Sequence, residues 1–236
     1  MGKNLIQQAR GKGSPTYRSP SFRFKGKPIH ATDKKIIGKV VNLVHCQGHT
    51  APLAHVVYDN DKEGLIIASE GLSVGQTVNV GSDAGVQSSN VLPLNKIPEG
   101  TLVHNIEQVP GDGGKFVRAS GTFAKVIGKK DNQVMVVLPS KKTKLFNESC
   151  RASIGVVAGG GRPEKPFLKA GFKMYKMRAR NKLYPRSSAA SMNAVDHPFG
   201  NKHSSRKSKA RPTSRNAPPG RKVGMIAARR TGRTKK

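Results

Sequence analysis

The lysines and arginines of this chain are concentrated at its two ends, and this constrains its fold more than any other feature. Residues 1–39 carry a net charge of +9, residues 40–165 carry +2, and residues 166–236 carry +19. Such an excess opposes compaction by self-repulsion unless a polyanion neutralises it. We therefore predict a near-neutral folded body between two cationic arms. A free-standing metabolic enzyme is disfavoured.

The cysteines and the hydropathy of the sequence indicate the cellular compartment in which the protein is expected. The two cysteines, Cys46 and Cys150, are far apart and lack the spacing of a metal site, so a disulfide framework is excluded and a reducing compartment is expected. No apolar run reaches the roughly 18 residues needed to span a bilayer. Met1 to Lys12 is polar and cationic and does not resemble a signal peptide. We expect a cytoplasmic protein without a membrane partner.

Aromatic rings are interleaved with cations in both arms. Phe22-Arg23-Phe24-Lys25 and Phe172-Lys173-Met174-Tyr175-Lys176 show this pattern. Cations neutralise phosphates, and rings can stack on bases, so we predict contact with RNA. The alternative is a solvated basic tail whose rings dock back on the body. The candidate phosphate-binding residues of the arms are Arg18, Arg23, Lys25, Arg211, Arg215, Arg221, Lys222, Arg229 and Arg230.

The central body reads as β-structure, because short β-branched runs alternate with Gly, Pro, Asn and Asp. Two small barrels fit this spacing better than one sandwich. The stretch from Gly81 to Leu94 is predicted to join them. The expected strands are Ile36–His45, Leu53–Tyr58, Leu65–Ala68, Thr77–Val80, Leu102–Ile106, Phe123–Ile127, Val134–Leu138 and Lys144–Phe146.

The arms are expected to contain little regular structure. The best helical candidate is Phe172 to Leu183, after Gly171 and before Pro185, although its apolar stripe is weak. From Pro185 onward the chain cannot bury enough apolar surface to offset its ordering entropy, so we expect it to fold only against a partner. The predicted division is a basic extension (1–34), a first barrel (35–84), a second barrel (85–165) and a basic extension (166–236).

Catalytic and metal-binding patterns are almost absent, so we predict neither an enzyme nor a cofactor. His45 and His49 have i, i+4 spacing but lack the Glu of a zincin motif, so no metal is expected. Gly159-Gly160-Gly161-Arg162 is not followed by the Lys-Ser/Thr of a Walker loop. Gly111 to Lys115 is either a tight hairpin loop or an amide-rich phosphate contact supplemented by Lys115 and Arg118.

Several long strings closely resemble one family, universal large ribosomal subunit protein two in its archaeal and eukaryotic form. They occur in the family's order, and the match to the family covers essentially the whole chain. They are Val91–Leu94, Ile97–Thr101, Val103–Glu107, Pro110–Lys115, Arg118–Thr122, Cys150–Gly155, Met192–Gly200, Ala217–Gly224 and Ile226–Gly232.

The resemblance implies a mainly β fold, an oligonucleotide-binding-type barrel followed by an SH3-like barrel, with long basic N- and C-terminal extensions. It implies a primary rRNA-binding protein of the large ribosomal subunit that supports assembly, subunit association and the architecture around the peptidyl transferase centre. The implied partners are large-subunit rRNA, neighbouring ribosomal proteins and small-subunit rRNA across the subunit interface. The implied location is the ribosome.

The matching strings also supply candidate site residues. Arg118 and Arg151 have small neighbours that allow close approach of RNA, whereas the alternative is a solvated face of the barrel. Asn193 and His197 lie in the Met192–Gly200 string. A histidine that contacts a phosphate or 2′-hydroxyl explains this string as well as a catalytic one. The remaining alternative is local packing beside Pro198.

Three positions depart from the family pattern. Asn201-Lys202 follows Gly200 where the family has further glycines, and His49 lies where the first barrel has an arginine. A contact through His49 should be weaker and pH-dependent. Before Met192, where the family usually has a segment that contains Arg-Gly, this chain has residues 186–191.

Two other functions remain as alternatives. A DNA-compacting polycation should carry repetitive helices or minor-groove wedges, whereas this arm is varied and rich in Gly and Pro. An RNA-processing enzyme should cluster its acids around a metal, whereas the acids here are scattered.

Overall fold

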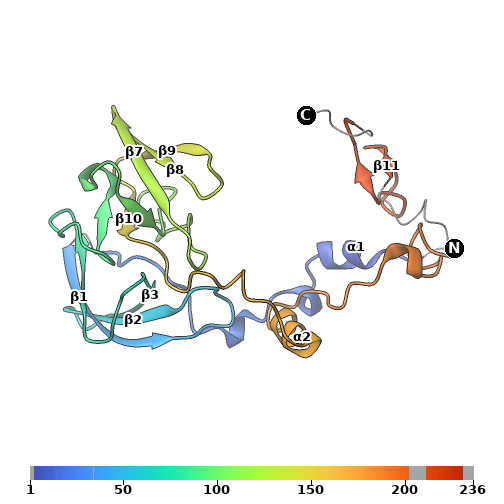
Figure 1. The fold of residues 1–236 in the computed structure, drawn as a ribbon, viewed down its shortest axis with the longest axis horizontal. Coiled ribbons are helices and arrows are strands. Elements are labelled where there is room, and N and C mark those ends of the chain that lie inside the picture. The colour runs from blue at the N-terminus through green and yellow to red at the C-terminus, as the bar shows by residue number, and fades with distance from the viewer. Residues whose placement is uncertain (1–2, 34, 202–210, 231–236) are drawn as a thin grey trace. The chain divides into compact units, whose positions relative to one another are not determined.

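The computed structural model describes residues 3–33, 35–201 and 211–230. By its internal contacts the chain divides into two units, a barrel unit of residues 21–168 and an extension unit of residues 1–20 with 169–236. Figure 1 labels β1, β2, β3 and β7 to β10 in the former, and α1, α2 and β11 in the latter. Among the described helices, none has the length and apolarity required to cross a membrane.

The first barrel is built from four antiparallel strands and a short 3-10 turn, η2 (Ser21–Arg23). These strands are β1 (Lys35–Val44), β2 (Leu53–Tyr58), β3 (Glu63–Ile67) and β4 (Thr77–Gly81), in the order β3-β2-β1-β4. In β1, Ile36, Gly38 and Val40 are buried and alternate with exposed residues, because successive side chains of a strand point to opposite faces. The inward residues join a core that includes Val56, Ile66 and Val78.

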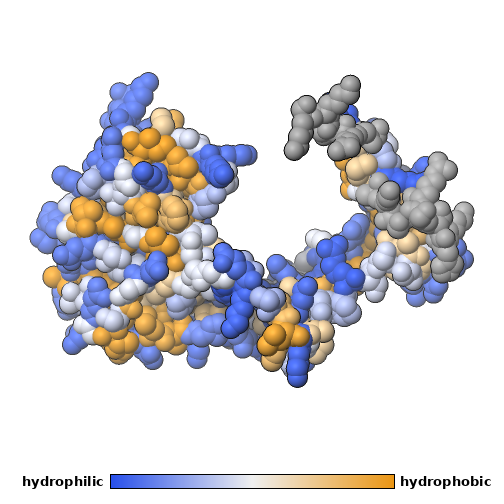
Figure 2. Space-filling view, viewed as in Figure 1, coloured by the Kyte–Doolittle hydropathy of each residue, from blue (hydrophilic) through white to orange (hydrophobic). Residues whose placement is uncertain are grey.

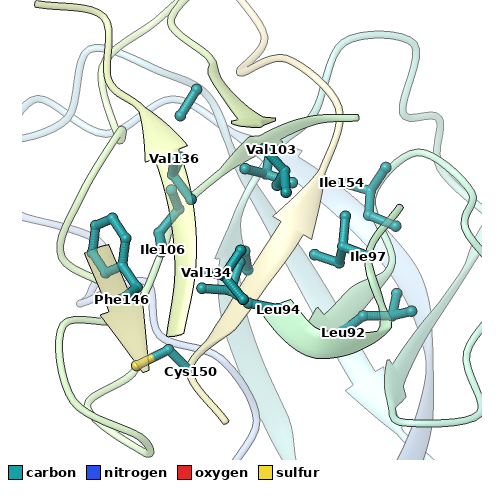
Figure 3. Packing of buried hydrophobic residues seen from close by; sticks show 13 residues of the cluster. Leu92, Leu94, Ile97, Val103, Ile106, Val134, Val136, Phe146, Cys150 and Ile154 are labelled. Carbon is teal, nitrogen blue, oxygen red and sulfur yellow. The ribbon is translucent and has the colours of Figure 1, made fainter. Parts of the chain in front are cut away.

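The second barrel contains six strands and the 3-10 turn η3 (Leu94–Lys96). The strands are β5 (Val91–Pro93), β6 (Leu102–His104), β7 (Ala124–Lys130), β8 (Gln133–Val137), β9 (Thr143–Asn147) and β10 (Arg151–Ile154). Figure 3 shows their inward side chains packed around Leu94, Ile97 and Val134, with Phe146 and Cys150 at one end. Each of these five residues is at most 3% exposed, so this barrel has an apolar core of its own.

Strand β5 connects the two cores. Its Val91 packs in the first core and its Leu92 in the second, since adjacent residues of a strand face opposite ways. One ten-stranded sheet therefore runs through both barrels in the order β3-β2-β1-β4-β5-β10-β6-β7-β8-β9, with β4 and β5 parallel. All its other strand pairs are antiparallel.

The predicted strands and fold class are confirmed. All eight expected strands are present, with ends within three residues of those predicted. The fold is mainly β, and its two cores correspond to the oligonucleotide-binding-type barrel and the SH3-like barrel. Strands β5 and β10 are additional to the prediction, and β5 lies inside the stretch expected to be only a junction. Both are too short and too poor in β-branched residues to be recognised from their own sequence. The four-part division of the chain stays a prediction.

The extension unit has short elements with few buried side chains. These are α1 (Ile6–Gly11), η1 (Pro15–Tyr17), α2 (Ala170–Arg178), η4 (Ala189–Ser191), and the parallel pair of β11 (Pro212–Thr213) and β12 (Met225–Ile226). Leu5 and Val223 are the buried apolar residues among its described stretches. The prediction that residues after Pro185 fold only against a partner concerns the free protein and stays a prediction.

Helix α2 is shorter than predicted. It begins at Ala170 rather than Phe172 and ends at Arg178 rather than Leu183. Asn181 has a left-handed φ of 49°, and the amide of Lys182 bonds back to the carbonyl of Met177, which terminates the helix. The Asn181 side chain also donates to the carbonyls of Thr16 and Arg18. These contacts hold the N-terminal segment beside the end of α2, a tertiary effect that the local sequence does not show.

Candidate nucleic-acid interface

Most of the positive charge belongs to the extension unit. It has 24 lysines and arginines and one acid, Asp196, a net charge of +23, whereas the barrel unit has 19 basic and 12 acidic residues, a net charge of +7. Figure 2 shows hydrophilic side chains over much of both units, interrupted by apolar patches. A polyanion would therefore be attracted chiefly by the two arms.

The predicted N-terminal cations are exposed. Arg18 lies in the extension unit, where its Nε donates to the carbonyl of Gly13 at 2.7 Å. Arg23 and Lys25 belong to the barrel unit, and both are exposed. The Arg23 guanidinium lies 5.3 Å from the ring centroid of Phe22, which is 82% exposed. This pair offers a cation and an aromatic face together to solvent.

Arg151, a predicted RNA-binding residue on β10, is instead engaged inside the barrel unit. Its Nη2 and Nε donate to Oε1 of Glu107 at 2.9 Å and 3.2 Å, and its Nη1 donates to the carbonyl of Ala31. Glu107 is fully buried. Burial raises the pKa of its carboxyl, but hydrogen bonds from Arg151 outweigh this and hold the pKa below its usual range.

Arg118 has the same inward role. Its Nη1 donates to the carbonyl of Gly114 at 2.9 Å, and its Nη2 to the carbonyl of Pro28 at 2.8 Å. Close by, the buried His30 places Nε2 2.7 Å from the carbonyl of Asn105. Burial lowers the pKa of His30 to about 4, so the ring is neutral near pH 7 and Nε2 is the donor.

The two arginines therefore attach residues 28–31 to the second barrel. Both arginines are partly buried and hydrogen-bonded within the barrel unit, so the alternative interpretation of a solvated barrel face does not describe them. Direct RNA contact by Arg118 and Arg151 stays a prediction. The observed contacts assign them a positioning role within the barrel unit.

The glycine loop before Arg118 is a tight hairpin loop rather than a phosphate cradle. The amides of Gly111 and Gly113 donate to the two carboxylate oxygens of Glu107, and that of Gly114 to Asp112. The amides of Asp112 and Lys115 donate to backbone carbonyls. No amide from 111 to 115 remains for a phosphate, because two carboxylates and two backbone carbonyls accept all five. Lys115 itself is exposed.

His197 lies in a compact turn of the extension unit. Its amide bonds to the carbonyl of Asn193, and its Nδ1 accepts the amide hydrogen of Phe199 at 3.0 Å. The proton of the neutral ring is therefore assigned to Nε2, which acts as a donor. Burial lowers the pKa of His197, which favours this neutral form. The ring packs edge-on against Phe199, with centroids 5.2 Å apart.

The turn also accommodates one departure from the family pattern. Gly200 is buried, and a Cβ there would collide with the carbonyl oxygens of Met192 and Asn193. The next residue, Asn201, has φ of 61° and bonds through its amide to the carbonyl of Met192. Asparagine tolerates the left-handed region better than most residues, so it can follow Gly200 here in place of glycine. Lys202 lies outside the described residues.

The C-terminal cations surround a second turn of the extension unit. Arg215, Arg221, Arg229 and Arg230 are exposed, whereas Arg211 and Lys222 are partly buried. The carbonyl of Arg211 accepts the amide of Met225, which pairs β11 with β12. Phe199 lines one cavity together with Arg211, Pro218 and Arg221, which lie 12 to 22 residues further along the chain. Phe199 and Pro218 are not among the predicted site residues, because a cavity wall has no sequence signature.

No metal-binding cluster is present in the stretches that the structure describes. They contain no group of three His, Cys, Asp or Glu side chains that could hold a metal ion. His49, at the second departure from the family pattern, places Nδ1 3.1 Å from Sγ of Cys46 and packs edge-on against Phe24. Its predicted pH-dependent RNA contact stays a prediction.

Comparison with known proteins gives a consistent result. The family model described as Ribosomal Proteins L2, C-terminal domain, matches residues 87–217. Large ribosomal subunit protein uL2 of Archaeoglobus fulgidus is 50% identical over 234 residues, with 98% of this chain and 99% of the relative covered. The protein of the same name from Methanothermobacter thermautotrophicus is 52% identical over 241 residues, with 99% of both covered.

Proposed function

Because the chain belongs to the uL2 family of large ribosomal subunit proteins, we propose that it is a structural constituent of the large subunit that binds rRNA directly. The observation that carries the proposal is the extension unit, with 24 basic residues against one acid. Self-repulsion of this size is relieved when phosphates neutralise it. Large-subunit rRNA, in a cytoplasmic ribosome, is the polyanion that fits the family.

The proposed phosphate contacts are cations of both arms and of the hairpin loop, and most of them are exposed. A varied, Gly- and Pro-rich arm suits an irregular folded RNA better than a regular duplex. Arg118 and Arg151 contribute by positioning residues 28–31 on the second barrel. The proposed contacts are Arg18, Arg23, Lys25, Lys115, Arg211, Arg215, Arg221, Lys222, Arg229 and Arg230.

His197 and Asn193 are proposed to contact RNA as structural groups rather than catalytic ones. Nδ1 of His197 is already an acceptor for the Phe199 amide, so Nε2 is left to donate to a phosphate or 2′-hydroxyl. A general base would need an unprotonated nitrogen facing the substrate. We propose that the protein supports assembly, subunit association and the architecture around the peptidyl transferase centre, beside neighbouring ribosomal proteins and small-subunit rRNA.

Truncation of the C-terminal arm tests the proposal. Residues 186–236 contain fourteen lysines and arginines. If half of these neutralise phosphates, removing them should flatten the log–log salt dependence of rRNA binding by about 5 to 6 units, at about 0.7–0.9 per contact. Binding should remain detectable through the N-terminal arm and Lys115.

The matched control is a full-length variant with Lys39→Gln and Lys62→Gln, two exposed lysines of the barrel unit outside the proposed set. Its salt slope should match that of the unmodified chain. A truncated protein with an unchanged slope would show that the arm does not touch rRNA. Equal affinity for duplex DNA of the same length would instead favour the architectural polycation.

A further inference from the structure

A cavity of about 580 Å³ lies in the C-terminal part of the extension unit. Its size is within the range of about 300–1,000 Å³ that is typical of small-ligand pockets. Its wall is made by residues of two strings that the family shares, the turn that ends at Gly200 and the turn around Pro218, together with residues of 211–216. The side chains that matter below are those of Phe199, Arg211, Pro212, Ser214, Pro218 and Arg221.

The charge of this cavity selects an anion. Arg211 and Arg221 both line it, and residues 197–236 contain no Asp or Glu that could neutralise them locally. Guanidinium groups present several donors in a planar fork that matches phosphate oxygens. A phosphate group is therefore the expected anionic part of the ligand.

The apolar part of the wall selects a flat ring. Phe199 offers an aromatic face, and Pro212 and Pro218 offer rigid, flat apolar surfaces that lose little entropy on binding. A nucleobase stacks on such surfaces whatever its identity. An acidic peptide would use the arginines but would leave these surfaces in contact with water.

The cavity wall is fixed by backbone contacts before any ligand binds. The amides of Met225 and Ala227 donate to the carbonyls of Arg211 and Thr213, and the Thr213 hydroxyl donates to the carbonyl of Val223. Gly224 has φ of 87°, and a Cβ there would meet the backbone of Arg211 and the ring of Phe199. This close packing sets the ring of Phe199 against the backbone of Arg211, the residue before β11.

We propose that this cavity takes one unstacked nucleotide of large-subunit rRNA, with its base against Phe199 and its phosphate on Arg211 and Arg221. The inference rests on the proposed rRNA-binding function and names the part of the RNA that the cavity recognises. Ser214 and Asn216 line the same cavity and supply polar groups for the ribose or the base edge. The site anchors the arm to a nucleotide that is turned out of its helix.

Two single substitutions in the full-length chain test the proposal, with large-subunit rRNA of the organism that encodes it as the probe. Phe199→Leu keeps an apolar side chain but removes the ring, so affinity should fall about fivefold or more with the salt slope unchanged. Arg221→Gln removes a phosphate contact, so the slope should flatten by about 0.7–0.9. Val195→Ala, in the same turn but outside the cavity wall, is the matched control for Phe199→Leu and should change neither quantity. Arg215→Gln should flatten the slope as Arg221→Gln does, because Arg215 is also a proposed phosphate contact; since Arg215 lies outside the cavity wall, this variant controls for the loss of one charge in the cross-linking test below.

Ultraviolet cross-linking locates the base directly. In the unmodified complex, the tryptic peptide of residues 187–202, which contains Phe199, should carry a cross-linked nucleotide. Phe199→Leu and Arg221→Gln should both weaken this cross-link, whereas Val195→Ala and Arg215→Gln should not. Because the Arg221 side chain is exposed, its variant still tests the site if Phe199→Leu disturbs the turn.

The outcomes separate the cavity from the general function. The nucleotide site would be overturned if Phe199→Leu binds rRNA as tightly as the unmodified chain and its cross-link is equally strong. It would also be overturned if Phe199→Leu keeps its affinity and neither the unmodified chain nor any variant forms the cross-link. If truncation after residue 185 still flattens the salt slope, rRNA binding by the arm stands without it. If truncation changes nothing, the proposed function fails first, and the cavity has no rRNA ligand.

Discussion

Replacing Arg151 with methionine should destabilise the barrel unit far more than the loss of an exposed charge would. The Arg151 side chain makes three hydrogen bonds to Glu107 and one to the carbonyl of Ala31. Glu107 is fully buried. Methionine retains much of the side-chain volume, but it leaves the carboxylate without its counter-ion.

The magnitude follows from this geometry. Removing one partner of a buried ion pair costs about 3–5 kcal/mol, because the other charge stays buried and uncompensated. Glu107 keeps the amides of Gly111, Gly113 and Arg151 as donors, so we expect the lower half of that range. With about 2–4 °C per kcal/mol for a protein of this size, the thermal midpoint should fall by about 6–16 °C.

The assay is urea unfolding of the full-length chain, followed by circular dichroism at low ionic strength. Lys35→Met is the matched control, since Lys35 forms a 2.9 Å ion pair with Asp83 whose side chains are 75% and 65% exposed. Exposed pairs contribute at most about 1 kcal/mol. A loss below about 1 kcal/mol for Arg151→Met would refute the positioning role.

The remaining predictions concern pH, the arms and His197. Burial lowers the pKa values of His30 and His104 from 6.5 to about 4, so the unfolded chain binds more protons than the folded chain below pH 6.5. Stability should therefore fall as the pH drops from 6.5 toward 4, by up to about 3 kcal/mol for each histidine. A urea midpoint that does not change over this pH interval would contradict the buried neutral rings. Limited trypsin digestion without RNA should leave a fragment near residues 35–165, and equal protection of residues 190–236 would contradict the prediction of arms that need a partner. His197→Ala should impair subunit assembly or association more than peptide transfer by fully assembled particles; a hundredfold loss of single-turnover transfer across pH 6 to 8.5, with assembly intact, would restore the catalytic interpretation.

The barrels and the arms can be predicted from the residues alone. Strand β2 matches its prediction to the residue, and β1 within one residue, because a half-buried strand has a period of two that its own residues display. The separation of a near-neutral body from cationic arms needs only the positions of charged residues. Long strings in the family's order are sufficient to identify the family.

What the candidate side chains face depends on tertiary contacts that no local pattern shows. Arg151 carries the same charge as Arg215, but Glu107, 44 residues away in sequence, draws the former inward. Strands β5 and β10 are recognisable only through their partners, and Phe199 and Pro218 share a cavity only because β11 pairs with β12. Local periodicity shows which side of a segment is exposed to solvent. Contacts between residues that are distant in sequence depend instead on how the segments pack and on the need to pair buried charges.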